Sequence, residues 1–110
     1  MIVIDTSNNI LITRGDTATI DISIKDEQGQ EYTLQAGDKI LFSVKKIAAT
    51  PNTVLEKTLN NKQLVLSSAD TDNLSFGTYK YDLTLITATE VCTFINYCDF
   101  IIGEEVHNLA

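Results

Sequence analysis

Apolar and polar residues alternate along much of this chain, with the period of two that is typical of half-buried β-strands. The longest clear run covers residues 78–86, where four apolar side chains share one face and Lys80, Asp82 and Thr84 share the other. Residues 17–25 alternate in the same way, and β-branched residues occur in both rows. Both runs therefore predict β-strands rather than helices.

Clusters of Gly, Asn, Asp and Ser separate these runs from shorter ones and mark the turns between strands. Residues 67–70 are expected to form a single helical turn, because Ser and Asp accept hydrogen bonds from free backbone amides. Pro51, the only proline, is expected in a loop at a sheet edge, and residues 104–110 as a frayed end. The predicted strands are residues 2–4, 10–13, 17–25, 31–34, 39–46, 53–59, 63–66, 78–86 and 91–102.

Seven to nine short strands with closely spaced turns predict an all-β fold, an antiparallel β-sandwich. No internal repeat, low-complexity tract or linker divides the chain, so residues 1–110 are expected to form one domain with its own core. The start of the chain meets an acid at Asp5 and has no basic segment, unlike a signal peptide. No apolar run approaches the roughly 20 residues that span a bilayer, so we expect folding in the cytoplasm.

The net charge of −7 disfavours two classes of partner. An acidic surface repels the phosphate backbone of nucleic acids, and it repels anionic membrane surfaces in the same way. We therefore expect neither a nucleic-acid partner nor a membrane partner, and the acidic residues are interpreted as keeping the protein soluble.

The two cysteines, Cys92 and Cys98, lie six positions apart in the last predicted strand. On one straight strand their α-carbons would be about 20 Å apart, whereas a disulfide needs them within about 7 Å. A bond would require a sharp turn at residues 96–97. We expect two free thiols that fill small spaces in the core.

We identify no catalytic, metal-binding or cofactor-binding residue in the sequence. The Arg-Gly-Asp tripeptide at residues 14–16 matches an integrin-binding motif, but it is interpreted as turn chemistry before a strand. Asp70 and Asp72 lack the glycine and glutamate of an EF-hand loop. His107, the only histidine, lies near the chain end without an orienting partner. A carboxylate pair for glycoside hydrolysis stays open among the 15 acids, yet the chain is short for a deep cleft. We expect a protein that is not an enzyme and has no small-molecule substrate.

Gly77, Tyr79 and Tyr81 follow a polar, Asp-rich turn with the spacing Gly-x-Tyr-x-Tyr. This pattern is typical of the tyrosine corner of immunoglobulin-like sandwiches, in which a tyrosine hydroxyl bonds the backbone a few residues upstream. We therefore predict a structural role for these residues.

The predicted strands carry more apolar residues than a monomeric sandwich needs. Outward-facing apolar residues indicate no function when they are scattered, but they indicate a subunit contact when they cluster. The register of the strands determines whether these residues cluster. Ile2 and Ile4 add an apolar N-terminal segment that could form an edge strand open to a neighbour. The candidates on the face opposite the main inward row are Leu41, Ile86, Val91, Ile95 and Ile101.

Three segments, residues 12–18, 34–44 and 77–83, together resemble the small immunoglobulin-like domain of phage and prophage virion proteins, including the N-terminal domain of phage baseplate upper proteins. Residues 99–106 are similar to the segment that follows in such proteins. We expect no stalk or receptor-binding region after Ala110, so the resemblance leaves the virion part open among tail, baseplate, neck and capsid decoration.

This resemblance implies a non-enzymatic structural or assembly protein, made in the host bacterial cytoplasm and located in the virion. Its partners would be other virion proteins or a second copy of the chain. The alternative is a carbohydrate- or host-surface-binding module. Such sites use exposed aromatic residues, whereas this chain has no Trp, and the alternation places most of its Tyr and Phe residues in the core. A small hydrolase is a third possibility, without a nucleophile–base pair to support it.

Overall fold

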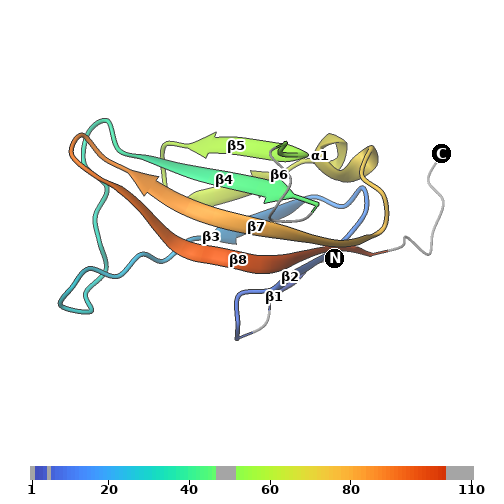
Figure 1. The fold of residues 1–110 in the computed structure, drawn as a ribbon, viewed down its shortest axis with the longest axis horizontal. Helices are drawn as coiled ribbons and strands as arrows, with labels where there is room; N and C mark the ends of the chain where they lie inside the picture. The colour runs from blue at the N-terminus through green and yellow to red at the C-terminus, as the bar shows by residue number, and fades with distance from the viewer. Residues whose placement is uncertain (1, 5, 47–51, 104–110) are drawn as a thin grey trace.

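The computed structural model describes residues 2–4, 6–46 and 52–103 (Figure 1). In this part of the chain, eight strands and one short helix confirm the all-β prediction. Pro51, His107 and the remainder of residues 104–110 lie outside the described residues. The elements are β1 (Ile2–Ile4), β2 (Ile10–Thr13), β3 (Ala18–Asp21), β4 (Lys39–Lys45), β5 (Leu55–Leu59), β6 (Gln63–Leu66), α1 (Ser68–Asp72), β7 (Gly77–Ile86) and β8 (Val91–Gly103).

Six of the strands form one sheet in the order β1-β2-β8-β7-β4-β5, and β3 pairs with β6 in a second, two-stranded sheet. The large sheet is mixed, because β2 runs parallel to β8, with Ile10 opposite Phe100. The prediction of a purely antiparallel fold is therefore wrong at this pair. Parallel strands need a long crossover connection, and here nearly the whole chain between β2 and β8 provides it.

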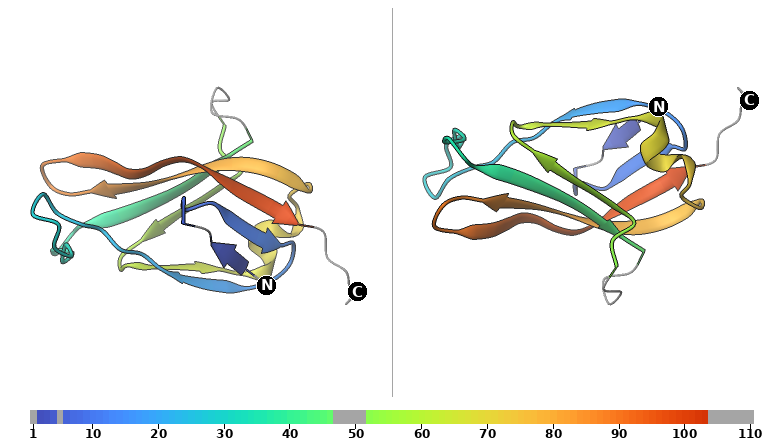
Figure 2. Two further views of the ribbon diagram at one scale, coloured as in Figure 1. Left: turned by 90° about the horizontal axis from the view of Figure 1, so that it is seen from below. Right: turned by 90° about the horizontal axis from the view of Figure 1, so that it is seen from above.

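The large sheet curls, and the β3–β6 pair lies across from it (Figure 2). One apolar core fills the space between them, and at its centre the rings of Phe42, Tyr81 and Phe100 pack with centroids 5.6 to 6.4 Å apart. Burial of the inward row of β7 confirms the predicted alternation. The buried apolar residues are Ile10, Ile12, Ala18, Ile22, Ile24, Ile40, Phe42, Val44, Leu59, Leu64, Leu66, Tyr79, Tyr81, Leu83, Leu85, Phe100 and Ile102.

The predicted strand at residues 17–25 ends early, at Asp21, and residues 31–34 form no strand. Glu31 explains both differences. Its carboxylate accepts hydrogen bonds from the Ser23 hydroxyl (2.7 Å) and the Ile24 amide (3.3 Å), so at this amide a side chain takes the place of a backbone partner. Only an isolated bridge between Lys25 and Glu31 remains of the expected pairing.

The helical turn predicted at residues 67–70 is confirmed as the start of α1. A capping box closes it, with the Asp70 carboxylate accepting from the Ser67 amide at 2.7 Å. Thr71 is fully buried, and its hydroxyl accepts from the Gly15 amide at 2.8 Å. This bond ties α1 to the turn at residues 14–16, which connects the two sheets.

Candidate functional site

The motifs that suggested chemistry have structural roles. Residues 14–16 form a turn, with the Asp16 amide donating to the Thr13 carbonyl at 3.0 Å. Asp70 caps α1 and pairs with Lys57 at 2.8 Å. Within the described ranges, no group of three His, Cys, Asp or Glu side chains could hold a metal ion. No helix in those ranges is long and apolar enough to cross a membrane.

The structure has the hydrogen bond that the tyrosine-corner spacing predicts. Tyr79 is only 4% exposed, and its hydroxyl donates to the Ser75 carbonyl, four residues upstream, at 2.9 Å. Gly77 precedes it with a φ of +134°, a conformation that side chains disfavour. The Tyr81 hydroxyl donates to the Asn8 carbonyl and so fastens the β1–β2 turn to the sheet.

Two irregularities in β8 decide which of its apolar residues face outward. Tyr81 lies opposite Cys98, but Leu83 lies opposite Ile95, and Thr84 then lies opposite Thr93. Each step adds one extra residue to β8, and each extra residue reverses the side on which the following residues lie. Ile95 falls between the two irregularities and packs against the core. Its predicted place on the outer face is therefore wrong.

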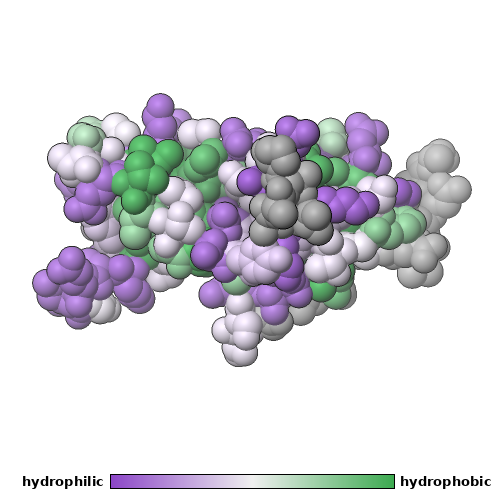
Figure 3. Space-filling view, in the orientation of Figure 1, coloured by the Kyte–Doolittle hydropathy of each residue, from purple (hydrophilic) through white to green (hydrophobic). Residues whose placement is uncertain are grey.

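The outer face carries an apolar patch at the end of the β7–β8 hairpin. Val91 is 74% exposed and lies directly opposite the half-buried Ile86. Leu41, on β4, is also half-buried and lies one step diagonally from Ile86, since it pairs with Thr84. Figure 3 looks onto this face and shows an apolar area over the hairpin end of β4 and β7. We call Leu41, Ile86 and Val91 the hairpin-end patch.

Ile101 belongs to a second apolar pair at the other end of the sheet, beside Leu11. Polar groups separate the two areas: Lys80 pairs with Asp99 in the middle of the outer face. The predicted candidates thus form two groups rather than one continuous surface. Leu11 is not among the predicted candidates, although the alternation within residues 10–13 places it outward.

β1 lies at one edge of the large sheet, as expected for an N-terminal edge strand. Its side chains lie on the other face from the one predicted, because Ile2 is opposite Ile12 and Ile4 is opposite Ile10, and both of these partners are core residues. Ile2 packs against the core, while Ile4 is 45% exposed at the open rim. These two residues therefore extend the inner face and do not join the outer one.

Both cysteines are free, as predicted. Cys98 is half-buried against the core. Cys92 is exposed, so its predicted role as a buried filler is wrong. It lies opposite Leu85 near the end of the sheet, where it lines a cavity instead of packing under β3 and β6.

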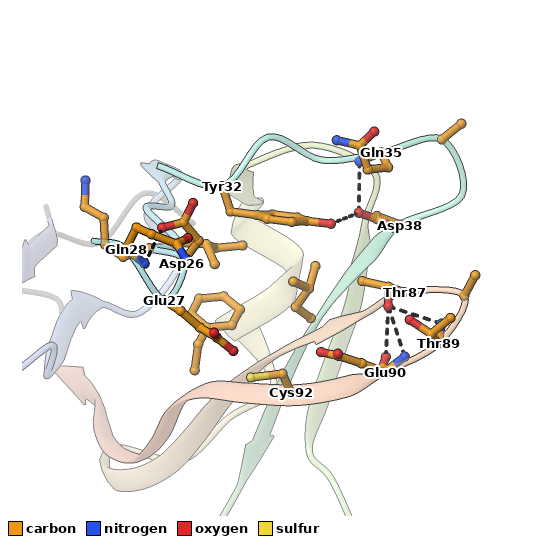
Figure 4. A pocket seen from close by; sticks show the side chains of 16 residues that line it. Asp26, Glu27, Gln28, Tyr32, Gln35, Asp38, Thr87, Thr89, Glu90 and Cys92 are labelled. Atoms are coloured by element: carbon orange, nitrogen blue, oxygen red, sulfur yellow. Dashed lines mark hydrogen bonds between the residues drawn. The ribbon is translucent and has the colours of Figure 1, made fainter. Parts of the chain in front are cut away.

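This cavity, of about 630 Å³, lies between the loop that spans residues 24–38 and the β7–β8 hairpin (Figure 4). The Tyr32 hydroxyl donates to the Asp38 carboxylate at 2.7 Å, and the Gln35 amide donates to the same oxygen at 2.9 Å. The bond to Asp38 raises the pKa of Tyr32 above its usual value. Across the cavity, the Thr87 hydroxyl accepts from the Glu90 amide at 3.0 Å and shapes the hairpin turn.

Sequence reasoning did not find this cavity, because its two walls come from loops far apart in the chain. Comparison of the chain with protein-family models, curated proteins and solved structures finds no match.

Proposed function

We propose that the chain is a non-enzymatic structural or assembly protein of a phage or prophage particle that acts through protein–protein contacts. The resemblance of residues 12–18, 34–44 and 77–83 to immunoglobulin-like virion domains supports this role. On this proposal the curled sheet and the β3–β6 pair are a variant of the immunoglobulin-like sandwich, with Tyr79 at its corner. The protein is made in the host bacterial cytoplasm and works in the virion, as a tail, baseplate, neck or capsid-decoration component.

The observation that carries the proposal is the hairpin-end patch. Fully burying a valine or isoleucine side chain contributes about 1.5 to 3 kcal/mol, and Val91 is largely exposed in the free chain. Ile86 and Leu41 extend the apolar surface beside it, and the polar Thr84 and Thr93 border them. An apolar centre with a polar rim is the usual composition of a protein interface. The patch is built on paired strands, so little conformational entropy is lost when a partner covers it.

The exposed aromatic residues argue against the alternative of carbohydrate stacking. The Phe76 ring has the Arg14 guanidinium 4.3 Å from its centroid, and the Tyr97 ring has the Lys80 ammonium at 4.7 Å. Each of these exposed rings thus already has a cation over one face, which leaves that face closed to a sugar ring.

The role predicts that the chain is present at fixed stoichiometry in particles purified from the strain that carries it. Val91→Glu should sharply reduce this incorporation, because a charge cannot be buried unpaired at a contact. Ile86→Glu should weaken incorporation in the same way, and more than it weakens the fold. Quantitative mass spectrometry of gradient-purified particles measures both effects.

The matched control is Val65→Glu, which places the same charge on β6, in the other sheet, at a valine that is 51% exposed. This variant should enter particles normally. Absence of the wild-type chain from the particles would refute the role. A loss of several kcal/mol of folding stability in Ile86→Glu would show that this residue belongs to the core, and the patch would then not be an interface.

A further inference from the structure

The cavity between the residue 24–38 loop and the β7–β8 hairpin has an apolar floor that no strand of the described part of the chain covers. Ile24 and Leu85 are buried at its base, and Tyr32 and Phe94 are half-buried beside them. The space of about 630 Å³ is large enough for a long side chain and its neighbours. Cavities of this size with a few polar groups at the rim are typical of binding sites.

The rim of the cavity is acidic, but its four carboxylates differ in what they contact. Asp26 accepts from the amides of Gln28 and Gln30, and Asp38 is held by Tyr32 and Gln35. These two acids therefore shape their own loop. The single basic residue of the rim, Lys25, pairs with Glu31 at 3.3 Å.

Glu27 and Glu90 remain, one on each wall. Their side chains point into the cavity from opposite sides (Figure 4). Within the described residues, neither carboxylate has a hydrogen bond or an ion pair. Two uncompensated negative charges thus face a largely apolar space, and a cation with an apolar stem would complement both features.

We propose that this cavity binds an arginine side chain presented, with an apolar neighbour, by a segment of a partner protein. A guanidinium has five donors to offer the two glutamates, and its methylene stem would pack on the half-buried Tyr32 and Phe94. Aromatic faces also attract guanidinium groups directly. The net charge of −7 would draw a basic segment toward the protein.

The partner is a different protein rather than a second copy. The only arginine of this chain, Arg14, already lies over the ring of Phe76. The proposal rests on the assembly role in one respect: it takes the occupant to be part of a protein.

Binding can be tested with the peptide acetyl-Leu-Arg-Phe-amide and with its citrulline counterpart, which keeps the shape and lacks the charge. In a titration followed by amide chemical shifts, the arginine peptide should move the resonances of Tyr32, Glu90 and Phe94. The citrulline peptide should bind about tenfold more weakly, the loss expected for about 1.4 kcal/mol of charge interaction. Raising the salt from about 0.05 M to about 0.5 M should weaken the arginine peptide only.

Glu27→Gln and Glu90→Gln should each weaken the arginine peptide several-fold and leave the citrulline peptide unchanged. Glu56→Gln, which removes the same charge from an exposed site on β5, is the control and should have no effect. Cys92 gives a second measurement: in a Cys98→Ala background, bound peptide should slow the reaction of this thiol with a disulfide reagent. No shift in the cavity resonances, or equal binding of the two peptides, would overturn the proposal.

The two proposals fail separately. Val91→Glu lies outside the cavity and should leave peptide binding unchanged even where it prevents incorporation into particles. Absence of the wild-type chain from the particles, with normal peptide binding, would refute the role and leave the cavity standing. Normal incorporation of the wild-type chain without peptide binding would refute only the cavity.

Discussion

Replacement of Tyr79 by Phe tests how much the tyrosine corner stabilises the fold. The ring is 4% exposed and stays packed in the variant, so the change removes one hydrogen bond, of 2.9 Å, without opening a cavity. Ser75, whose carbonyl loses its partner, is itself exposed, and water can therefore reach that oxygen. The expected cost is that of a lost net hydrogen bond, about 1 kcal/mol, without the larger penalty of a buried unpaired group.

Urea unfolding measures this cost. For a slope of about 1 to 2 kcal/mol per molar urea, the midpoint of the variant should fall by roughly 0.5 to 1 M with the slope unchanged. Tyr97→Phe is the control, because Tyr97 is 51% exposed and its hydroxyl has no hydrogen bond within the described residues. It should shift stability by less than about 0.5 kcal/mol. A Tyr79→Phe midpoint no lower than that of Tyr97→Phe would refute the corner.

Two further predictions concern the cysteines and a carboxylate. Cys98→Ala should lower the urea midpoint through a small cavity, whereas Cys92→Ala should not, and a reductant should leave the melting temperature of the native protein unchanged. The ion pair with Lys62 lowers the pKa of Glu31 to about 2. The pKa of Glu31 is lower in the folded chain than in the unfolded chain, where it is near 4.5, so the ionised carboxylate stabilises the fold at pH values above 4.5. This contribution is lost as the pH falls from 4.5 toward 2. The midpoint difference between wild type and Glu31→Gln should therefore disappear over that pH range, and a constant difference would refute the contribution.

Local patterns were enough to predict most of the strands, the turn of α1 and the inward row of β7. Each of these depends on side-chain alternation or capping within a few residues. The tyrosine corner also spans only a few positions. The parallel pairing of β2 with β8 depends instead on contacts across nearly the whole chain, which alternation does not encode.

Alternation also fails to predict the face of the sheet on which Ile95 lies, although here the cause is within one strand. Two extra residues in β8 restore the original alternation by Cys92, so the two ends of the strand agree with the sequence pattern and only the stretch between them is reversed. Tyr97, with a φ of 58°, marks the first irregularity. Its amide donates to the Asp82 carboxylate at 2.7 Å, so that a side chain across the sheet replaces a regular backbone partner. A pairing between residues fifteen positions apart in sequence therefore decides the register.

A single polar cluster accounts for both the missing strand at residues 31–34 and the cavity. The Ile22 amide donates to the Lys62 carbonyl at 2.8 Å, and Lys62 also pairs with Glu31 at 2.6 Å. These bonds hold the chain beyond β3 in place without a β-ladder, although Ile22 and Ile24 still reach the core. The loop that follows is therefore free to stand apart from the β7–β8 hairpin. A continued ladder would have satisfied this backbone in a sheet, and the residues that now line the cavity would not face one another across an open space.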